Sequence, residues 1–199
     1  MAFIRTIPVA EATGEVRALY EQNREPSGLV PNFVKAFSLR PTVWNNYVQL
    51  VRSIRGNLDL RRYELVTTAT ALALESSYCA LAHGKALRDR VLGAEQTEAF
   101  ARDFRQAELT PAETIMVAFV QKMALRPSSI TQADVDELRS HGFSDEEIFD
   151  IVSVSSVRGF FSKVLDAVGA EPDSIYLDME QGLRQALTVG RAIETSPAK

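Results

Sequence analysis

The sequence contains few of the residue types on which most site chemistry depends. Its 199 residues include one cysteine, Cys79, and two histidines, His83 and His141. A single cysteine excludes an intramolecular disulfide and a CxxC redox pair, so no disulfide framework is expected. With so few nitrogen and sulfur ligands and no HExxH motif, a transition-metal site would depend on carboxylates, and no suitable carboxylate cluster is evident. We therefore expect neither a metal nor a cofactor.

Long hydrophobic runs and an excess of positive charge are also missing. No run approaches the roughly 18 apolar residues of a membrane span, so no membrane association is expected. The net charge of −4 and the pI of about 5.3 argue against a nucleic-acid partner, which usually requires a basic face. The opening residues, MAFIRTIPVA, are too short and too interrupted for a secretory signal, so the cytoplasm is the expected location.

Helical periodicity is what the chain does contain. Apolar residues recur at helical spacing, and capping boxes begin at Thr110 and Ser144. Convincing strand alternation is absent, which predicts an all-α fold: one compact multi-helix domain over residues 1–193 and a flexible tail over 194–199. The expected helical segments are 10–24, a short helix after Pro31, 41–54, 60–74, 77–93, 94–105, 111–125, 131–139, 145–168 and further patterning in 174–193.

The most unusual stretch is ELVTTATALALESSYCALAH, which begins at Glu64. Cys79 and His83 are four residues apart in it, so on one helix they share a face. The helix that Glu64 heads lacks a polar face, which predicts that it is buried. A new helix is expected to begin near Ser76, with Cys79 in its first turn. Orphan N–H groups and the helix dipole favour a thiolate there, and a neighbouring imidazolium would add to that effect.

Together these residues form a candidate catalytic set. Cys79 would be the nucleophile, His83 the acid–base group, and Glu64 the group that orients the imidazole or accepts its proton. Each residue alone also has a structural explanation, because lone cysteines are often inert core residues. Their joint spacing is what favours a functional interpretation.

These residues resemble the site of the carboxymuconolactone decarboxylase and alkylhydroperoxidase D family, in particular its peroxidase-related branch. That family has a glutamate, then Cys-x-x-Cys, then a histidine. The spacing is the same here, where eleven residues separate Glu64 from Ser76 and three separate Cys79 from His83. The segments LVPNFVKAFSLRP and SDEEIFDIV also resemble that branch. The likeness covers about residues 5–170 and implies the helical alkylhydroperoxidase D-like fold.

The chain departs from the family motif at Ser76, which stands where the first cysteine is expected. In the family, the cysteine matched by Cys79 is the activated thiol, and it forms a disulfide with the first cysteine during turnover. A serine hydroxyl can form a hydrogen bond or relay a proton, but it cannot resolve an oxidised thiol. A Cys79 oxidised by peroxide would therefore stop at sulfenic acid and need an external thiol for recycling.

The resemblance leaves three functional hypotheses open. The first is a peroxidase-like, thiol-dependent antioxidant oxidoreductase that uses Cys79 on a small hydroperoxide. The second is a non-redox lyase resembling carboxymuconolactone decarboxylase, in which Glu64 and His83 perform acid–base chemistry on a small carboxylated substrate. The third is a family member that keeps the fold without catalysis.

Several other residues have two interpretations each. Arg61, Arg62 and Lys85 are possible anchors for a substrate carboxylate in the lyase hypothesis, although a solvated face fits them better. The aromatic residues Trp44 and Tyr47 fit a core position better than a pocket wall.

Two further expectations concern a helix end and assembly. His141 precedes a glycine and is expected to end a helix, where a cation is favourable. By resemblance to the family, we also expect a homo-oligomer, a trimer or a hexamer.

Overall fold

The computed structural model describes residues 2–195, which form ten α-helices and, within that range, no strand. The helices are α1 (Gly14–Gln22), α2 (Asn32–Ala36), α3 (Pro41–Arg55), α4 (Leu60–Ala73), α5 (Ser77–Leu87), α6 (Ala94–Arg102), α7 (Pro111–Leu125), α8 (Gln132–Ser140), α9 (Asp145–Val168) and α10 (Gln181–Leu187). The all-α expectation is therefore confirmed for the described residues. None of their helices is long and apolar enough to cross a lipid bilayer.

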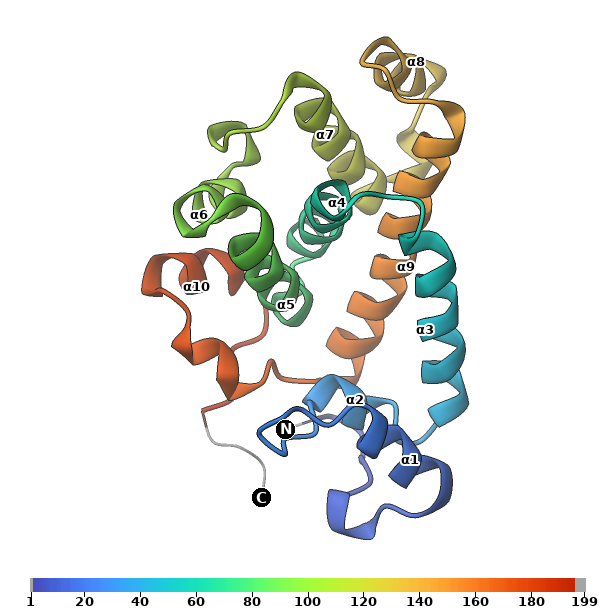
Figure 1. Cartoon of the computed structure of the whole chain (residues 1–199), viewed down its shortest axis with the longest axis vertical. Coiled ribbons are helices and arrows are strands. Elements are labelled where there is room, and N and C mark those ends of the chain that lie inside the picture. The colour runs from blue at the N-terminus through green and yellow to red at the C-terminus, as the bar shows by residue number, and fades with distance from the viewer. Residues whose placement is uncertain (1, 196–199) are drawn as a thin grey trace.

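Helix α4 lies at the centre of the fold. It packs against α5, α7 and α9, and Figure 1 shows these helices surrounding it. Every residue from Tyr63 to Ala71 is buried, including Glu64. The missing polar face of this segment is explained by this position, since a helix with neighbours on all sides has no face in contact with water.

The helix ends follow the capping signals in the sequence. Thr110 and Ser144 each accept a hydrogen bond from the backbone N–H of the glutamate three residues later, and both capping boxes are complete. Helix α5 continues through a π-helical turn, Arg88–Leu92, and ends at Gly93, where φ is 81°. The left-handed backbone at Gly93 is one that glycine adopts without steric cost.

The turn between α4 and α5 has the hydrogen bonds of a Schellman motif. The N–H of Ser76 donates to the carbonyl of Ala71, and the N–H of Glu75 donates to the carbonyl of Leu72. Glu75 occupies the left-handed position with φ of 54°, where glycine is usual. The C-terminal segment packs on this turn, because a Cβ at Gly190 would collide with the Glu75 carbonyl and the Gly190 N–H donates to Ser77 Oγ (2.7 Å).

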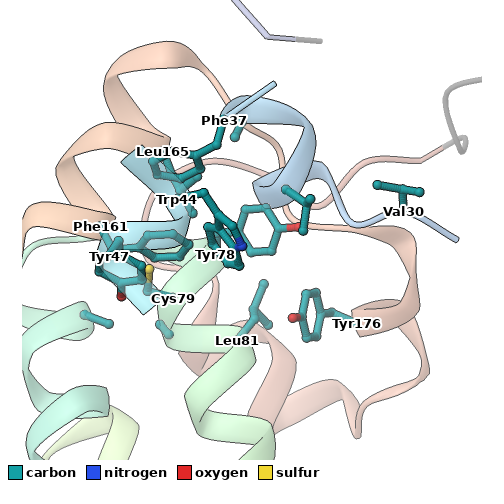
Figure 2. Close-up of a cluster of buried hydrophobic side chains, with 14 of the residues drawn as sticks. Val30, Phe37, Trp44, Tyr47, Tyr78, Cys79, Leu81, Phe161, Leu165 and Tyr176 are labelled. Atoms are coloured by element: carbon teal, nitrogen blue, oxygen red, sulfur yellow. The ribbon is translucent and has the colours of Figure 1, made fainter. Parts of the chain in front are cut away.

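The buried apolar residues form two clusters. One lies between α4, α7 and α9, and the other fills the space between α2, α3, α5 and the second half of α9. The second cluster is rich in aromatic rings, and Figure 2 shows Cys79 at its edge, with Tyr47 and Phe161 as labelled neighbours. Trp44 and Tyr47 belong to this cluster, as expected.

The structure corrects several segment boundaries. The helix expected over 10–24 begins only at Gly14, because a separate 3-10 turn, Val9–Glu11, precedes it. The helix expected over 94–105 ends at Arg102, where Asp103 becomes extended and caps a 3-10 turn with its side chain. Within 174–193, regular α-helix is limited to α10.

The predicted tail also begins too early. Glu194, placed at its start, is 8% exposed and accepts a hydrogen bond from Asn32 Nδ2 (2.8 Å). Its backbone N–H donates to the carbonyl of Pro172. Glu194 is therefore part of the packed fold. Residues 196–199 lie outside the described residues.

Candidate functional site

Glu64 and His83 form a hydrogen-bonded pair between α4 and α5. Glu64 is 3% exposed, and its Oε2 lies 2.8 Å from His83 Nδ1. A carboxylate can only accept, so the imidazole proton is assigned to Nδ1. This tautomer leaves Nε2 with a free lone pair, which makes it the proton acceptor of the pair. The predicted relation between these two residues is thus present in the structure.

His83 is neutral near pH 7. Burial lowers its pKa from 6.5 to about 4, and the nearby positive charge of Arg158 acts in the same direction, while the hydrogen bond to Glu64 opposes both. The imidazolium expected to stabilise the thiolate is therefore not the resting form. His83 is suited to accept a proton during a reaction, with Glu64 stabilising the charge that develops.

The positive charge beside the thiol comes from Arg158, on α9. Its Nη1 lies 3.7 Å from the sulfur of Cys79, and the two side chains are buried. Burial acts to lower the pKa of Arg158, but Cys79, Tyr47 and Tyr63 outweigh that effect, so its pKa is raised. A guanidinium in contact with a sulfur stabilises the thiolate form, which is the nucleophile in thiol chemistry.

A cavity of about 320 Å³ opens over the sulfur and joins these groups. Cys79 and His83 line it from α5, and Arg158 lines it from α9. Its other walls are mainly aromatic and aliphatic side chains from α2, α3, α5 and α9: Phe33, Trp44, Tyr47, Val48, Val51, Tyr78, Ala82 and Phe161, with Arg52 and Arg55 from α3. Trp44 and Tyr47 are therefore both core residues and cavity walls, so their two interpretations are compatible.

Ser76 lies apart from this cavity. It is fully buried at the N-cap position of α5, although its side chain does not cap the helix. Its hydroxyl forms no well-aligned hydrogen bond among the described residues, yet it lies close enough to Asp166 to oppose the rise in the pKa of that carboxyl that burial causes. A hydrogen bond between Ser76 and the Glu64–His83 pair is not part of this arrangement.

The three residues proposed as carboxylate anchors do not line the cavity. Each forms an ion pair elsewhere: Arg61 Nε with Glu113 (2.5 Å), Arg62 Nη1 with Glu147 (2.5 Å), and Lys85 Nζ with Asp89 (2.6 Å). The anchoring role is therefore contradicted by their positions.

His141 lies at the end of α8, as expected. It is exposed, and its Nδ1 is 2.9 Å from the carbonyl of Glu137. This contact is local to the helix end and remote from Cys79, so it gives His141 no part in the site.

Arg158 is the site residue that the sequence reasoning missed. The available signal was its isolation: between Asp150 and Lys163, Arg158 is the only charged residue. A lone arginine in a buried apolar stretch needs a specific partner, because burying a charge without one is costly. That partner, Cys79, precedes it by 79 positions.

Comparison with known proteins agrees with this fold. Residues 41–121 match the carboxymuconolactone decarboxylase family. A peroxidase-related protein from Silicibacter sp. TM1040 has 25% identity and a TM-score of 0.78, with 89% of this chain and 95% of that one aligned. An alkylhydroperoxidase AhpD core protein from Ralstonia eutropha JMP134, also called peroxidase-related, has 23% identity with the same TM-score and coverage. The AhpD-like fold is thereby confirmed.

A more distant structure shares the fold as well. It is a cysteine-to-alanine variant of the debrominase Bmp8 in complex with 2,3,4-tribromopyrrole, with 16% identity, a TM-score of 0.68, and 92% of this chain and 94% of that one aligned. At this identity the likeness concerns the fold alone. No curated protein sequence matches the chain.

Proposed function

Because residues 41–121 match the carboxymuconolactone decarboxylase family, we propose that this chain is a peroxidase-like, thiol-dependent oxidoreductase with one reactive cysteine. The observation that carries the proposal is the contact of Cys79 with Arg158 in a cavity that is also lined by the neutral His83, which Glu64 holds from behind by a hydrogen bond. A cation, a thiol and a proton acceptor in one cavity are the parts that a nucleophilic sulfur requires. Two structures with this fold are named peroxidase-related, which supports a hydroperoxide as the substrate.

The reaction begins with transfer of the Cys79 proton to Nε2 of His83. The thiolate then attacks the terminal oxygen of a hydroperoxide, ROOH, so that an S–O bond forms and the O–O bond breaks. The leaving alkoxide takes the proton from His83 and departs as the alcohol, ROH. Cys79 remains as sulfenic acid, and the hydroperoxide is reduced.

Recycling depends on an external thiol, because the described chain has no second cysteine. A first thiol condenses with the sulfenic acid and releases water, which leaves a mixed disulfide on Cys79. A second thiol attacks that disulfide, restores the Cys79 thiol and leaves as the external disulfide. The single sulfur of this chain is thereby sufficient for a complete cycle when a small-molecule thiol is supplied.

Trapping the sulfenic acid tests the proposal. After a short hydroperoxide pulse, we expect Cys79 to react with a dimedone probe, and we expect steady peroxide consumption once a small thiol is added. The Cys79→Ser variant should show neither reaction. If excess hydroperoxide leaves Cys79 as a free thiol, the proposal is wrong and the chain lacks this activity.

The Glu64–His83 pair supports a second candidate, a lyase that uses proton transfer without sulfur chemistry. The supporting observation is a neutral imidazole with a free Nε2 in the wall of a cavity that three arginines without a carboxylate partner among the described residues also line. Activity on a small carboxylated substrate would then survive Cys79→Ser but not His83→Ala. A loss of activity in both variants would instead favour the thiol mechanism.

A further inference from the structure

The cavity over Cys79 has an excess of positive charge. Arg52, Arg55 and Arg158 line it, and none of the three has a carboxylate partner among the described residues. The guanidinium carbon of Arg55 lies 5.0 Å from the centroid of the Tyr63 ring, so its partner is an aromatic face. His83 is neutral, and burial raises the pKa of the Tyr47 and Tyr78 phenols, so among the lining residues only Cys79 can carry an offsetting negative charge near neutral pH.

Arg158 is the buried member of this set of positive charges, because it is only 6% exposed. One of its terminal nitrogens contacts Cys79, while its Nε has no hydrogen-bond partner in the described structure. A guanidinium offers five N–H donors in a flat fork, and an oxyanion with two oxygens matches that fork. A buried cation with an unfilled edge lacks the compensation that burial of charge requires.

The walls next to Arg158 are flat. The ring of Phe161 stacks on that of Tyr47, with centroids 4.8 Å apart and planes 13° from parallel. The guanidinium carbon of Arg158 lies 5.3 Å from the centroid of the Phe161 ring. The ring centroids of Trp44 and Phe161 are 6.0 Å apart. Phe161 also stacks on Phe37, with centroids 5.7 Å apart and planes 5° from parallel, so ring edges are what this wall offers to a ligand. Such edges favour another ring in an edge-to-face arrangement.

The size of the cavity limits the ligand. A volume of about 320 Å³ is near the lower end for small-molecule sites, which run from roughly 300 to 1,000 Å³. A single ring with a small substituent matches that volume. A nucleotide or a long acyl chain does not.

We propose that the cavity binds a small aromatic carboxylate, with its carboxylate on the guanidinium of Arg158 and its ring against the edges of Tyr47 and Phe161. Arg52 and Arg55, both exposed, attract the anion to the mouth of the cavity. The inference rests on the proposed function in one respect: the ligand would occupy the same cavity in which Cys79 is proposed to react. The ligand approaches Cys79 closely enough to shield its sulfur from reagents in solution.

The chain contains two internal reporters for a direct test. Trp44 is the only tryptophan and Cys79 is the only cysteine, and both line this cavity. Benzoate serves as the probe, with benzamide as the uncharged match and cyclohexanecarboxylate as the charged but non-aromatic match. Trp44 fluorescence measures binding, and the rate of Cys79 alkylation by iodoacetamide measures shielding.

We expect saturating benzoate to change Trp44 fluorescence and to slow alkylation by about tenfold or more, and both matched compounds to bind at least about tenfold more weakly. Arg158→Gln should weaken benzoate binding by a similar factor. If Arg158→Gln folds poorly, the double variant Arg52→Gln and Arg55→Gln replaces it in the test, because both positions are exposed. This double variant should also bind benzoate more weakly than wild type does. Arg126→Gln, an exposed arginine remote from the cavity, is the matched control and should bind as wild type does.

Two results would overturn the inference: no effect of benzoate on either reporter, or equal binding of benzoate and benzamide. The proposed function has a separate readout, which is oxidation of Cys79 by hydroperoxide without benzoate. Shielding without oxidation would refute the peroxidase proposal and leave the ligand inference standing. Oxidation without shielding would refute the ligand inference alone.

Discussion

The guanidinium of Arg158 contacts the sulfur of Cys79 at 3.7 Å, although 79 positions separate the two residues in the sequence. The contact exists because α9 packs across α4 and against α5 in the core. Each residue satisfies a need of the other: the sulfur gains a cation that stabilises its anionic form, and the buried cation gains a polar partner. The proposed reactivity of Cys79 therefore depends on helix packing as well as on its place in α5.

Replacement of Arg158 should change the alkylation rate of Cys79 and the melting temperature of the protein in different ways. In Arg158→Met we expect alkylation of Cys79 near neutral pH to slow by about tenfold, because the thiolate loses its cation. The melting temperature should stay the same or rise, because removing an incompletely paired buried charge is often neutral or stabilising. Arg158→Lys, which keeps the charge, should recover part of the rate. An unchanged alkylation rate with a lower melting temperature would show that Arg158 only fills space.

The depressed pKa of His83 predicts a dependence of stability on pH. The folded-state pKa is about 4 and the ordinary value is 6.5, so the unfolded state binds the proton more tightly. The contribution of His83 to stability is fully present above pH 6.5 and is lost as the pH falls from 6.5 to 4. Its size is on the order of 3 kcal/mol.

Urea unfolding across that pH range would measure the effect. His83→Gln should flatten the acid limb of the stability curve, and His141→Gln, an exposed histidine, should leave it as in wild type. Equal slopes in wild type and His83→Gln would contradict the assignment of a neutral, largely buried imidazole.

Restoring the missing thiol tests the role of position 76. After a hydroperoxide pulse, wild-type protein should gain the mass of one oxygen on Cys79, whereas Ser76→Cys should lose two hydrogens as a disulfide forms. Intact-mass measurement distinguishes the two products. Ser77→Cys is a matched buried control, because its side chain points to Gly190 and residues two apart on a helix do not face each other. A disulfide in the control and none in Ser76→Cys would refute the proposed pairing.

The contact of Gly190 with Glu75 predicts that the C-terminal segment stabilises the α4–α5 turn. In Gly190→Ala the added methyl group would displace the Glu75 carbonyl, at a cost of about 1–3 kcal/mol in unfolding free energy. Because the turn leads directly into the helix of Cys79, the alkylation rate should change as well. Gly56→Ala is the control, since the nearest atom to its new Cβ, other than neighbours, lies at an ordinary 3.8 Å. Equal stability of the two variants would contradict this role.

Oligomerisation remains a prediction, and a substitution in one exposed apolar groove can test it. A second, apolar groove of about 580 Å³ lies between α3 and α9, and its wall includes Val43 (41% exposed), Leu50 (51%) and Phe160 (45%). Exposed apolar side chains gathered in this way are typical of protein contacts. We expect a trimer or hexamer by light scattering, and a shift to smaller species in Leu50→Glu. A wild-type monomer would refute the expectation.

The elements of this fold were predictable because their signals are local. Capping boxes at Thr110 and Ser144 and the proline at the start of α3 mark helix starts directly in the sequence. Likewise, the four-residue spacing of Cys79 and His83 places both on one face of a helix, and this follows from the sequence without any tertiary contact. The early end of α6 was missed because it depends on the extended backbone of Asp103, which apolar periodicity does not report.

The rest of the site was not predictable because it depends on which helix faces meet. Nothing local tells whether Arg158 points to solvent, to a carboxylate or to a sulfur. Ser76 shows the same limit: its sequence position is that of a partner for Cys79, whereas in the structure its hydroxyl lies close to Asp166 on α9. The neutral state of His83 is also set by burial and by Arg158, two features of the packed core.

The residues that line the cavity come from two regions of the chain, one inside and one outside the segment that matches the family. Residues 41–121, which match the family, contain Glu64, Cys79 and His83, together with the tyrosine and tryptophan of α3. Phe33, Arg158 and Phe161 come from outside that region. The matched region therefore contains the three motif residues and most of the cavity wall, whereas the cation beside Cys79 comes from outside it. Substitutions in α2 and the second half of α9 can thus alter the cavity while Glu64, Cys79 and His83 stay unchanged.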